Sequence, residues 1–369
     1  MDILKIKDSM KSLWKETFGD SSEYVSLIFD TYFNPEYIAH HEEEDEVIAA
    51  LLGIPYCFLS SSGTRLRGLY LCGLATRKAY RRRGIMTGLI REINHKAKDK
   101  GFDFTFLIPS EDGIKRYYHN LGYIDSFYKK IEYYVKGHKF ITDGAEITLK
   151  EITVNETEQI MGFLTKKGNE PYKNPASFIL LHSEQDWRTV IEEALMSGDK
   201  LIVGQHEADI RSVAFCKLTE DSVEIKKIIS ADEQSEAQLL DGIINKYPEH
   251  NLTIIADLEA VLEHNSSNQL WSPFYAQNNG KKAEYEDIAV VEEPYNVSRN
   301  ARPFGMINIL DMKIMLRKTG FNKFKDIEVY SEEELKKMIL RKPVGHGSDA
   351  LEKILDLPEI NFSISLMLE

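Results

Sequence analysis

The spacing of apolar residues in the first part of the chain predicts two helices followed by alternating strands and helices. Between residues 13 and 32, apolar side chains recur every three or four positions, which is typical of helices. The polar stretch 19–22 separates the two helices, and Ser21 or Ser22 would cap the second one. Strands are expected at 47–54, 56–60, 68–75, 102–108 and 123–134. Helices are expected at 86–98 and 113–120, and Gly101 is a stop signal for the first of them.

The same order of elements returns after a connector at about 137–151. Helices are expected at 151–164, 186–196 and 234–247, and strands at 200–204, 212–218, 222–230 and 252–257. Hairpin, strand, helix and strand therefore occur twice, which indicates a divergent internal copy.

A third piece begins near residue 300. It has an apolar stretch at 304–316, a helix at 331–340 and a strand at 360–368. Such an arrangement predicts the α/β class, α+β with mixed sheets, and three domains at 1–137, 138–299 and 300–369.

Composition excludes several classes of protein. The 369 residues are too many for one ordinary core, and 43% hydrophobic with 28% charged residues is typical of globular proteins. No apolar stretch is long enough to span a membrane, and no signal peptide is recognisable at the N-terminus. Three scattered cysteines favour the cytoplasm. The histidines have no partners at metal-ligand spacing, so no metal is expected.

The formal net charge of -13 speaks against a nucleic acid partner, because both molecules would be negative. It favours a cationic small molecule or serves only solubility. The acidic run at 42–46 also has two interpretations: it is a solvated hairpin end, or it is a rim of the acceptor site that attracts cations.

A basic loop contrasts with this acidic background. It lies between the strand at 68–75 and the helix at 86–98, and contains Arg77, Lys78, Arg81, Arg82 and Arg83. A helix beginning at or just after Gly84 would present unpaired N–H groups and a partial positive charge. Arginine forks bind phosphate oxygens, so the pattern predicts an anion site.

Two motifs in this region resemble those of the GNAT superfamily of N-acetyltransferases. Residues 81–86, Arg-Arg-Arg-Gly-Ile-Met, resemble its Gln/Arg-x-x-Gly-x-Gly/Ala signature, with Met86 as a departure at the last position. Residues 117–123, Tyr-Tyr-His-Asn-Leu-Gly-Tyr, resemble its Phe-Tyr-x-x-x-Gly-Phe segment. The resemblance implies that acetyl-CoA is the co-substrate. It places the pantetheine on backbone groups of Leu74, Ala75 and Thr76, and the pyrophosphate on Arg82, Arg83, Gly84, Met86 and Thr87.

The resemblance also implies that Tyr118 is the general acid. When an amine attacks a thioester, the leaving thiolate must be stabilised or protonated. A tyrosine hydroxyl holds its proton at neutral pH and can do this. Packing in an amphipathic helix is the alternative explanation for Tyr118.

The order of domains is similar to that of the enhanced-intracellular-survival (Eis-like) acetyltransferases. A GNAT domain is followed by a degenerate second GNAT-like domain and a C-terminal α/β domain, which is sterol-carrier-like in that family and much shorter here. There the C-terminal carboxylate can act as a base in the active site. The resemblance therefore makes Glu369 a second catalytic candidate, although the family usually ends in an aromatic residue.

The internal copy lacks the features of an anion site. The loop after its strand at 222–230 has no glycine and carries three carboxylates, those of Asp232, Glu233 and Glu236. These charges would repel a diphosphate, so this copy is not expected to bind CoA.

The expected function is transfer of an acetyl group from acetyl-CoA to a primary amine of a small molecule or peptide. Aminoglycoside-like compounds, polyamines and lysine are the candidate acceptors. A non-catalytic acyl-CoA-binding or regulatory module, a structural protein with a relic site and an aminoacyl-tRNA-dependent transferase remain alternatives, the last disfavoured by the acidic charge. Neither nucleic acid nor a membrane is expected as a partner, and a homo-oligomer is left open.

Overall fold

The computed structural model of the protein describes residues 1–142, 144, 146–173, 177–257, 301–311, 314–315, 318 and 361–363. The predicted helix at 331–340, most of the strand at 360–368 and the candidate base Glu369 lie outside the described residues.

The first unit comprises the elements from residue 1 to residue 134. They are α1 (Ile3–Phe18), α2 (Ser22–Tyr32), η1 (Pro35–Tyr37), β1 (Ile38–Glu43), β2 (Glu46–Ser60), β3 (Arg65–Thr76), η2 (Lys78–Tyr80), α3 (Ile85–Asp99), β4 (Phe104–Leu107), α4 (Asp112–His119) and β5 (Ile124–Tyr134). The predicted helices of this part are confirmed, and so are its predicted strands except that two of them form the single strand β2. Ser21 caps α2 by accepting a hydrogen bond from the Tyr24 N–H. The strand β1 was not predicted.

The second unit comprises the elements from residue 148 to residue 257. They are β6 (Thr148–Ile152), η3 (Val154–Glu156), α5 (Glu158–Lys167), β7 (Ser177–Leu181), α6 (Glu184–Met196), β8 (Lys200–His206), β9 (Asp209–Leu218), β10 (Ser222–Ser230), α7 (Glu233–Lys246) and β11 (Asn251–Asp257). The strands β12 (Ala301–Ile309) and β13 (Asn361–Ser363) follow.

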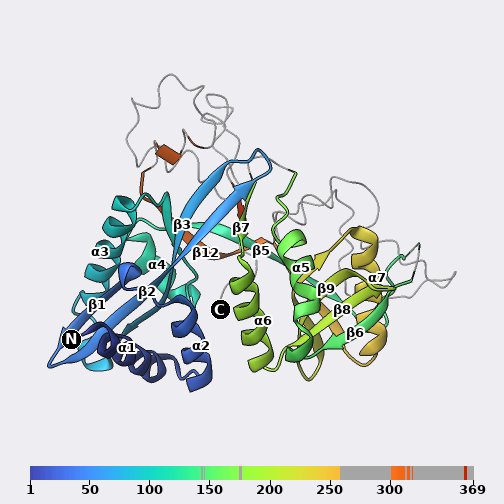
Figure 1. Cartoon of the computed structure of the whole chain (residues 1–369), viewed down its shortest axis with the longest axis horizontal. Coiled ribbons are helices and arrows are strands. Elements are labelled where there is room, and N and C mark those ends of the chain that lie inside the picture. The colour runs from blue at the N-terminus through green and yellow to red at the C-terminus, as the bar shows by residue number, and fades with distance from the viewer. Residues whose placement is uncertain are drawn as a thin grey trace, which may run out of the picture.

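One mixed sheet connects the two units, as Figure 1 shows. Its strand order is β12-β4-β3-β2-β7-β13-β5-β11-β10-β9-β8-β6, with β1 beside β2. The mixed α/β class is thereby confirmed. The strand β12 pairs with both β4 and β5, so the predicted third piece contributes its first strand to the sheet of the first unit. The division into three domains stays a prediction.

Three predicted elements differ from the structure. The runs at 47–54 and 56–60 form the single strand β2, because Pro55 lies between Leu52, where pairing with β1 ends, and Cys57, where pairing with β7 begins. A missing N–H is tolerated on such an unpaired edge. The predicted helix at 151–164 begins only at Glu158, because residues 148–152 pair with β8 as a strand.

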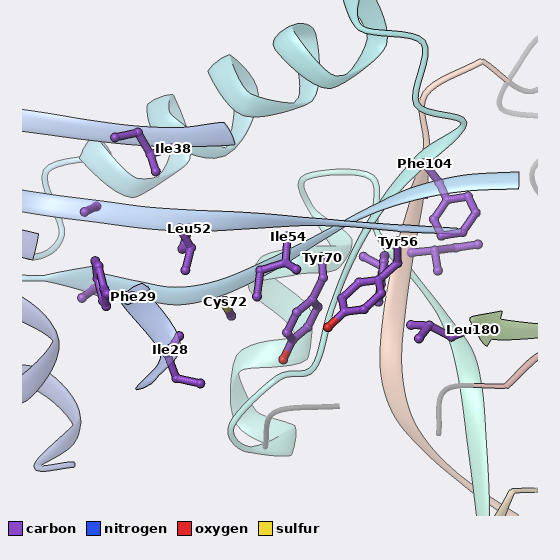
Figure 2. Packing of buried hydrophobic residues seen from close by; sticks show 14 of the residues in the cluster. Ile28, Phe29, Ile38, Leu52, Ile54, Tyr56, Tyr70, Cys72, Phe104 and Leu180 are labelled. Carbon is purple, nitrogen blue, oxygen red and sulfur yellow. The ribbon is translucent and has the colours of Figure 1, made fainter. Parts of the chain in front are cut away.

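The sheet of the first unit separates two hydrophobic cores. On one face, Ile54, Tyr56, Tyr70 and Cys72 pack with residues of α1 and α2, as seen in Figure 2. On the other face, Leu69, Leu71 and Leu107 pack with residues of α3 and α4. The two clusters are called the α1/α2 face and the α3/α4 face below. Burying each large aliphatic side chain contributes about 1.5–3 kcal/mol, so α3 is held firmly by Leu89, Ile90 and Ile93.

Candidate active site

The strands β3 and β4 separate at the centre of the first unit. They run parallel and pair at three positions, Gly68–Phe104, Leu69–Thr105 and Tyr70–Phe106. Beyond Tyr70, β3 continues to Thr76 with β2 as its one partner among the described strands. One edge of residues 71–76 therefore presents backbone N–H and C=O groups to an extended ligand that carries amide groups.

A β-bulge at Gly73 shapes this free edge. Leu52 pairs with Cys72 and Ala50 with Ala75, so β3 has one residue more than β2 at this place. Gly73 has a φ of 59°, and a Cβ atom there would lie 2.1 Å from Cζ3 of Trp14. Only glycine fits, and the bulge redirects Leu74, Ala75 and Thr76 toward the basic loop.

The basic loop is fixed by its own side chains. Arg81 donates from Nε to the Thr76 carbonyl at 2.9 Å, and Arg83 donates to the Ala79 carbonyl at 3.1 Å. The Arg83 guanidinium also lies 4.9 Å from the ring centre of Tyr80. Arg82 and Gly84 both adopt left-handed backbone, with φ of 66° and 79°. These contacts give the loop one defined course into α3.

The helix α3 begins without a side-chain cap. Gly84 is its N-cap residue, the first turn has no acidic residue, and the first helical bond runs from the Gly88 N–H to the Gly84 carbonyl. Within the described residues, the N–H groups of Ile85, Met86 and Thr87 have no hydrogen-bond partner. No atom lies within 4 Å of the place where a Gly84 Cβ would be. This helix start fits a phosphate group.

The cations of the loop divide into two groups. Arg77 pairs with Glu46 at 2.9 Å and lies 3.7 Å from Glu16, so it serves the structure. Arg82 and Arg83 are exposed, and no carboxylate of the described residues pairs with them. Glu46 belongs to the acidic run at 42–46, whose Glu44 and Asp45 form the turn between β1 and β2 with φ of 50° and 61°.

Tyr118 lies on the α3/α4 face and is 7% exposed. Burial, with a smaller contribution from Tyr117, raises its pKa to about 12, and its hydroxyl makes no hydrogen bond within the described part of the chain. The neighbouring Tyr117 hydroxyl lies 3.1 Å from Thr87 Oγ1 in the first turn of α3. This contact ties α4 to the uncapped helix start.

The structure thus brings together most of the predicted site residues. Leu74, Ala75 and Thr76 lie on the free edge of β3, and the basic loop and α3 follow directly. Met86 packs against the α3/α4 face and Glu369 lies outside the described residues. Sequence reasoning missed Gly73, although a glycine inside a strand is a known signal of a bulge. It also missed the hydroxyl contact of Tyr117.

In the first unit, a parallel strand pair separates beside an uncapped helix that follows a glycine. Residues 5–124 match the family model of the acetyltransferase (GNAT) domain, and this part of the chain is a GNAT acetyltransferase domain.

Solved structures with the same fold cover most of the chain. A conserved protein of unknown function from Enterococcus faecalis V583, described as a probable N-acyltransferase, is 12% identical with a TM-score of 0.60, over 85% of this chain and 72% of that one. Eis1 from Mycobacterium abscessus is 10% identical with a TM-score of 0.56, over 86% and 74%. A GCN5-related N-acetyltransferase from Anabaena variabilis ATCC 29413 is 13% identical with a TM-score of 0.55, over 84% and 70%. No curated protein matches the sequence.

These neighbours, Eis1 among them, have the same fold over most of the chain. Within the described residues, no three or more His, Cys, Asp or Glu side chains form a group that could hold a metal ion. No helix in the same residues is long and apolar enough to cross a membrane.

Proposed function

We propose that the protein transfers an acetyl group from acetyl-CoA to a primary amine of a small molecule or peptide. The observation that carries this proposal is the uncapped start of α3, where three N–H groups without partners meet Arg82 and Arg83 beside the free edge of β3. Oriented N–H groups and arginines are the groups that bind a diphosphate.

Each part of the co-substrate has a matching surface in this proposal. The amide groups of the pantetheine pair with the backbone of Leu74, Ala75 and Thr76. The pyrophosphate lies against Gly84 and the N–H groups of Met86 and Thr87, with Arg82 and Arg83 on its outer side. Gly84 leaves room for this close approach, because no atom lies where a side chain would begin.

Tyr118 acts on the leaving group. The amine attacks the thioester carbonyl, a C–N bond forms, and the C–S bond breaks to release the thiolate. Because burial raises its pKa to about 12, Tyr118 keeps its proton at neutral pH and donates it, or a hydrogen bond, to the sulfur. The proton lost by the amine goes to a base, for which Glu369 stays the candidate implied by the family resemblance.

The acceptor must approach a strongly negative protein. The formal net charge of -13 favours cationic amines over anionic ones, which keeps aminoglycoside-like compounds, polyamines and lysine as candidates. These acceptors share a primary amine that is protonated in water.

A turnover screen tests the proposal. The protein is incubated with acetyl-CoA and a panel of amines, and released thiol is measured, while calorimetry gives the affinity for acetyl-CoA. We expect micromolar binding and thiol release with at least one cationic amine. Binding without release on any amine would favour the non-catalytic alternative, and a lack of binding would refute the proposal.

A further inference from the structure

A cavity of about 730 Å³ opens between the first and second units on the α1/α2 face of the sheet. Its walls come from the end of α2, from residues 54–57 of β2, and from the chain between β7 and the first turn of α6. This volume is typical of sites for small molecules. None of the predicted site residues that the structure describes lines the cavity.

One end of the cavity is formed by Ile54 of β2, the strand next to the place where β3 and β4 separate. Ile54 in its wall pairs with Tyr70, and Tyr70 pairs with Phe106 in the last contact before the strands part. The ring centres of Tyr56 and Phe106 are 6.4 Å apart. Figure 2 shows Ile54, Tyr56 and Tyr70 extending from the same face of the sheet. A thioester held between the strands would lie one strand from this cavity on the α1/α2 face, with Tyr118 on the other face.

The other end carries a carboxylate. Asp186 on α6 accepts hydrogen bonds at Oδ2 from the Ser183 N–H and hydroxyl, at 2.7 and 2.6 Å. Its Oδ1 accepts one bond, from the Tyr32 hydroxyl of α2 at 3.1 Å. Within the described residues no Lys, Arg or His pairs with Asp186, which is half-buried, whereas Glu184 of the same helix is exposed and pairs with Arg188.

Two tyrosine hydroxyls accompany this carboxylate. Tyr56 lies beside Tyr32, and burial followed by the nearby charge of Asp186 raises the pKa of Tyr32, so that its hydroxyl stays neutral. Oδ1 of Asp186 and the Tyr56 hydroxyl oxygen can each accept a further hydrogen bond, whereas the Tyr32 oxygen already has hydrogen bonds with Tyr56 and Thr189. An ammonium group donates three, and its positive charge would balance the unpaired carboxylate.

The two ends favour different protonation states of an amine. Near Ile54, Tyr70 and Phe106 the surroundings are largely apolar, which favours the neutral, nucleophilic amine. Beside Asp186 a negative charge favours the ammonium ion, which cannot attack a thioester. A ligand that suits both ends therefore carries two amino groups.

On the basis of the function proposed above, we propose that this cavity binds the acceptor. Asp186, oriented by the Tyr32 hydroxyl and flanked by Tyr56, holds the second, non-reacting ammonium of a small diamine or polyamine. The reacting amine of the same molecule lies at the end formed by Ile54. Asp186 is then a specificity-determining residue contributed by the second unit to a reaction of the first.

Matched pairs of acceptors test this role. The probes are 1,4-diaminobutane with n-butylamine and 1,6-diaminohexane with n-hexylamine, measured by thiol release. For at least one pair we expect kcat/KM of the diamine to exceed that of the monoamine by tenfold or more. In Asp186→Asn and in Tyr32→Phe this ratio should fall to about 1–3, while KM for acetyl-CoA is unchanged. Equal ratios in the wild type and both variants would overturn the proposal.

The control variant is Glu184→Gln, which removes a charge from the same helix. Glu184 pairs with Arg188 and lies outside the cavity wall, so the diamine preference should persist. Asparagine at 186 can still accept from Ser183, and Tyr32→Phe leaves that contact untouched, so both variants should fold. A loss of preference in Glu184→Gln would show that overall charge, not the cavity, selects the acceptor.

A binding measurement separates this inference from the proposed function. Ligand-observed NMR follows 1,4-diaminobutane and 1,6-diaminohexane on the protein without acetyl-CoA. If a diamine binds and Asp186→Asn weakens it by tenfold, while no amine releases thiol from acetyl-CoA, the proposed function fails and the cavity site stands. If neither diamine binds to the wild type, or both bind equally to Asp186→Asn, the cavity is not a diamine site.

Discussion

The first and second units contain the same arrangement of three antiparallel strands, a helix and a parallel strand. In the first unit β3 pairs with β4 up to Tyr70 and continues to Thr76, and in the second β10 pairs with β11 up to Ile225 and continues to Ser230. Each long strand is irregular where the pair separates, at Gly73 in one and at Lys226 in the other. The backbone therefore provides the same opening twice.

The two helix starts at these openings differ in chemistry. In α7 the N-cap is Asp232, whose carboxylate accepts from the Ser235 N–H at 2.8 Å and from its hydroxyl at 2.7 Å. Glu233 and Glu236 add negative charge in the first turn, and Arg211 pairs with Asp232. In α3 a glycine stands at the cap and no acid follows.

The comparison shows which feature separates a binding site from a structural helix. A carboxylate cap occupies the N–H groups that would receive a phosphate and repels the phosphate charge. The fold alone does not select between these outcomes, because the strands separate in both units. The residue at the cap position does.

The largest expected effect tests whether the catalytic acid lies in the first unit. Tyr118→Phe should lower kcat by about 10²-fold or more, since general acid catalysis typically contributes 10²- to 10⁴-fold. The affinity for acetyl-CoA should not change, because within the described part of the chain the Tyr118 hydroxyl makes no hydrogen bond to the basic loop or to the start of α3. Steady-state kinetics with thiol release and calorimetry give the two values.

Tyr117→Phe is the control for this variant. It removes the hydroxyl that contacts Thr87 and leaves the aromatic pair Phe-Tyr. Loss of this hydrogen bond should cost about 1 kcal/mol, which corresponds to a roughly fivefold fall in kcat/KM. If Tyr117→Phe lowered kcat as much as Tyr118→Phe, the assignment of the acid would be wrong.

A smaller effect is expected when the cap chemistry of the second unit is placed in the first. Gly84→Asp puts a carboxylate at the start of α3, beside the proposed diphosphate. At a partly solvated site the repulsion amounts to about 2 kcal/mol, roughly a 30-fold loss of acetyl-CoA affinity. Isothermal titration calorimetry at fixed ionic strength measures the loss.

Backbone strain must be separated from charge in this experiment. Gly84 has a φ of 79°, so any side chain there costs about 1–2 kcal/mol of stability. Gly84→Ala carries this strain without the charge and should change the acetyl-CoA affinity less than threefold. Equal losses of affinity in both variants would mean that conformation, and not the carboxylate, controls the site.

Much of the fold could be predicted from local signals. Periodicity identified α1, α2, α3 and α7 because each buries one regular apolar face and has a cap or stop residue nearby. The strands β1, β6 and β7 were missed because they are short or lie beside polar segments. Each is defined by its partner strand and not by its own pattern.

Part of the candidate site could also be predicted from local signals, and part could not. The loop from Arg81 to Thr87 could be predicted because its residues are consecutive and their backbone forms the anion site. The contact of Trp14 with Gly73 and that of Tyr32 with Asp186 join distant parts of the chain, 154 positions apart in the second case. No local pattern signals such contacts. The position of β12 between β4 and β5 was unpredictable for this reason as well.

The smallest effect is expected in the second unit. Asp232→Ala removes the cap of α7, and the N–H and hydroxyl of Ser235 lose their acceptor. The loss should be about 1 kcal/mol of stability, a fall in Tm of roughly 2–4 °C. The exposed pair with Arg211 adds little. Thermal unfolding measures the shift, and Asp232→Asn, which can still cap, should stay near the wild type.

Removal of this cap should not create a second acetyl-CoA site. Asp232 has extended backbone with φ of -160°, whereas Gly84 reaches α3 through a left-handed turn, so the two helix starts are oriented differently toward their loops. Glu233 and Glu236 also remain and oppose a diphosphate. Calorimetry on Asp232→Ala should therefore give one site per chain, and a second site would show that the carboxylate cap alone had closed the second unit.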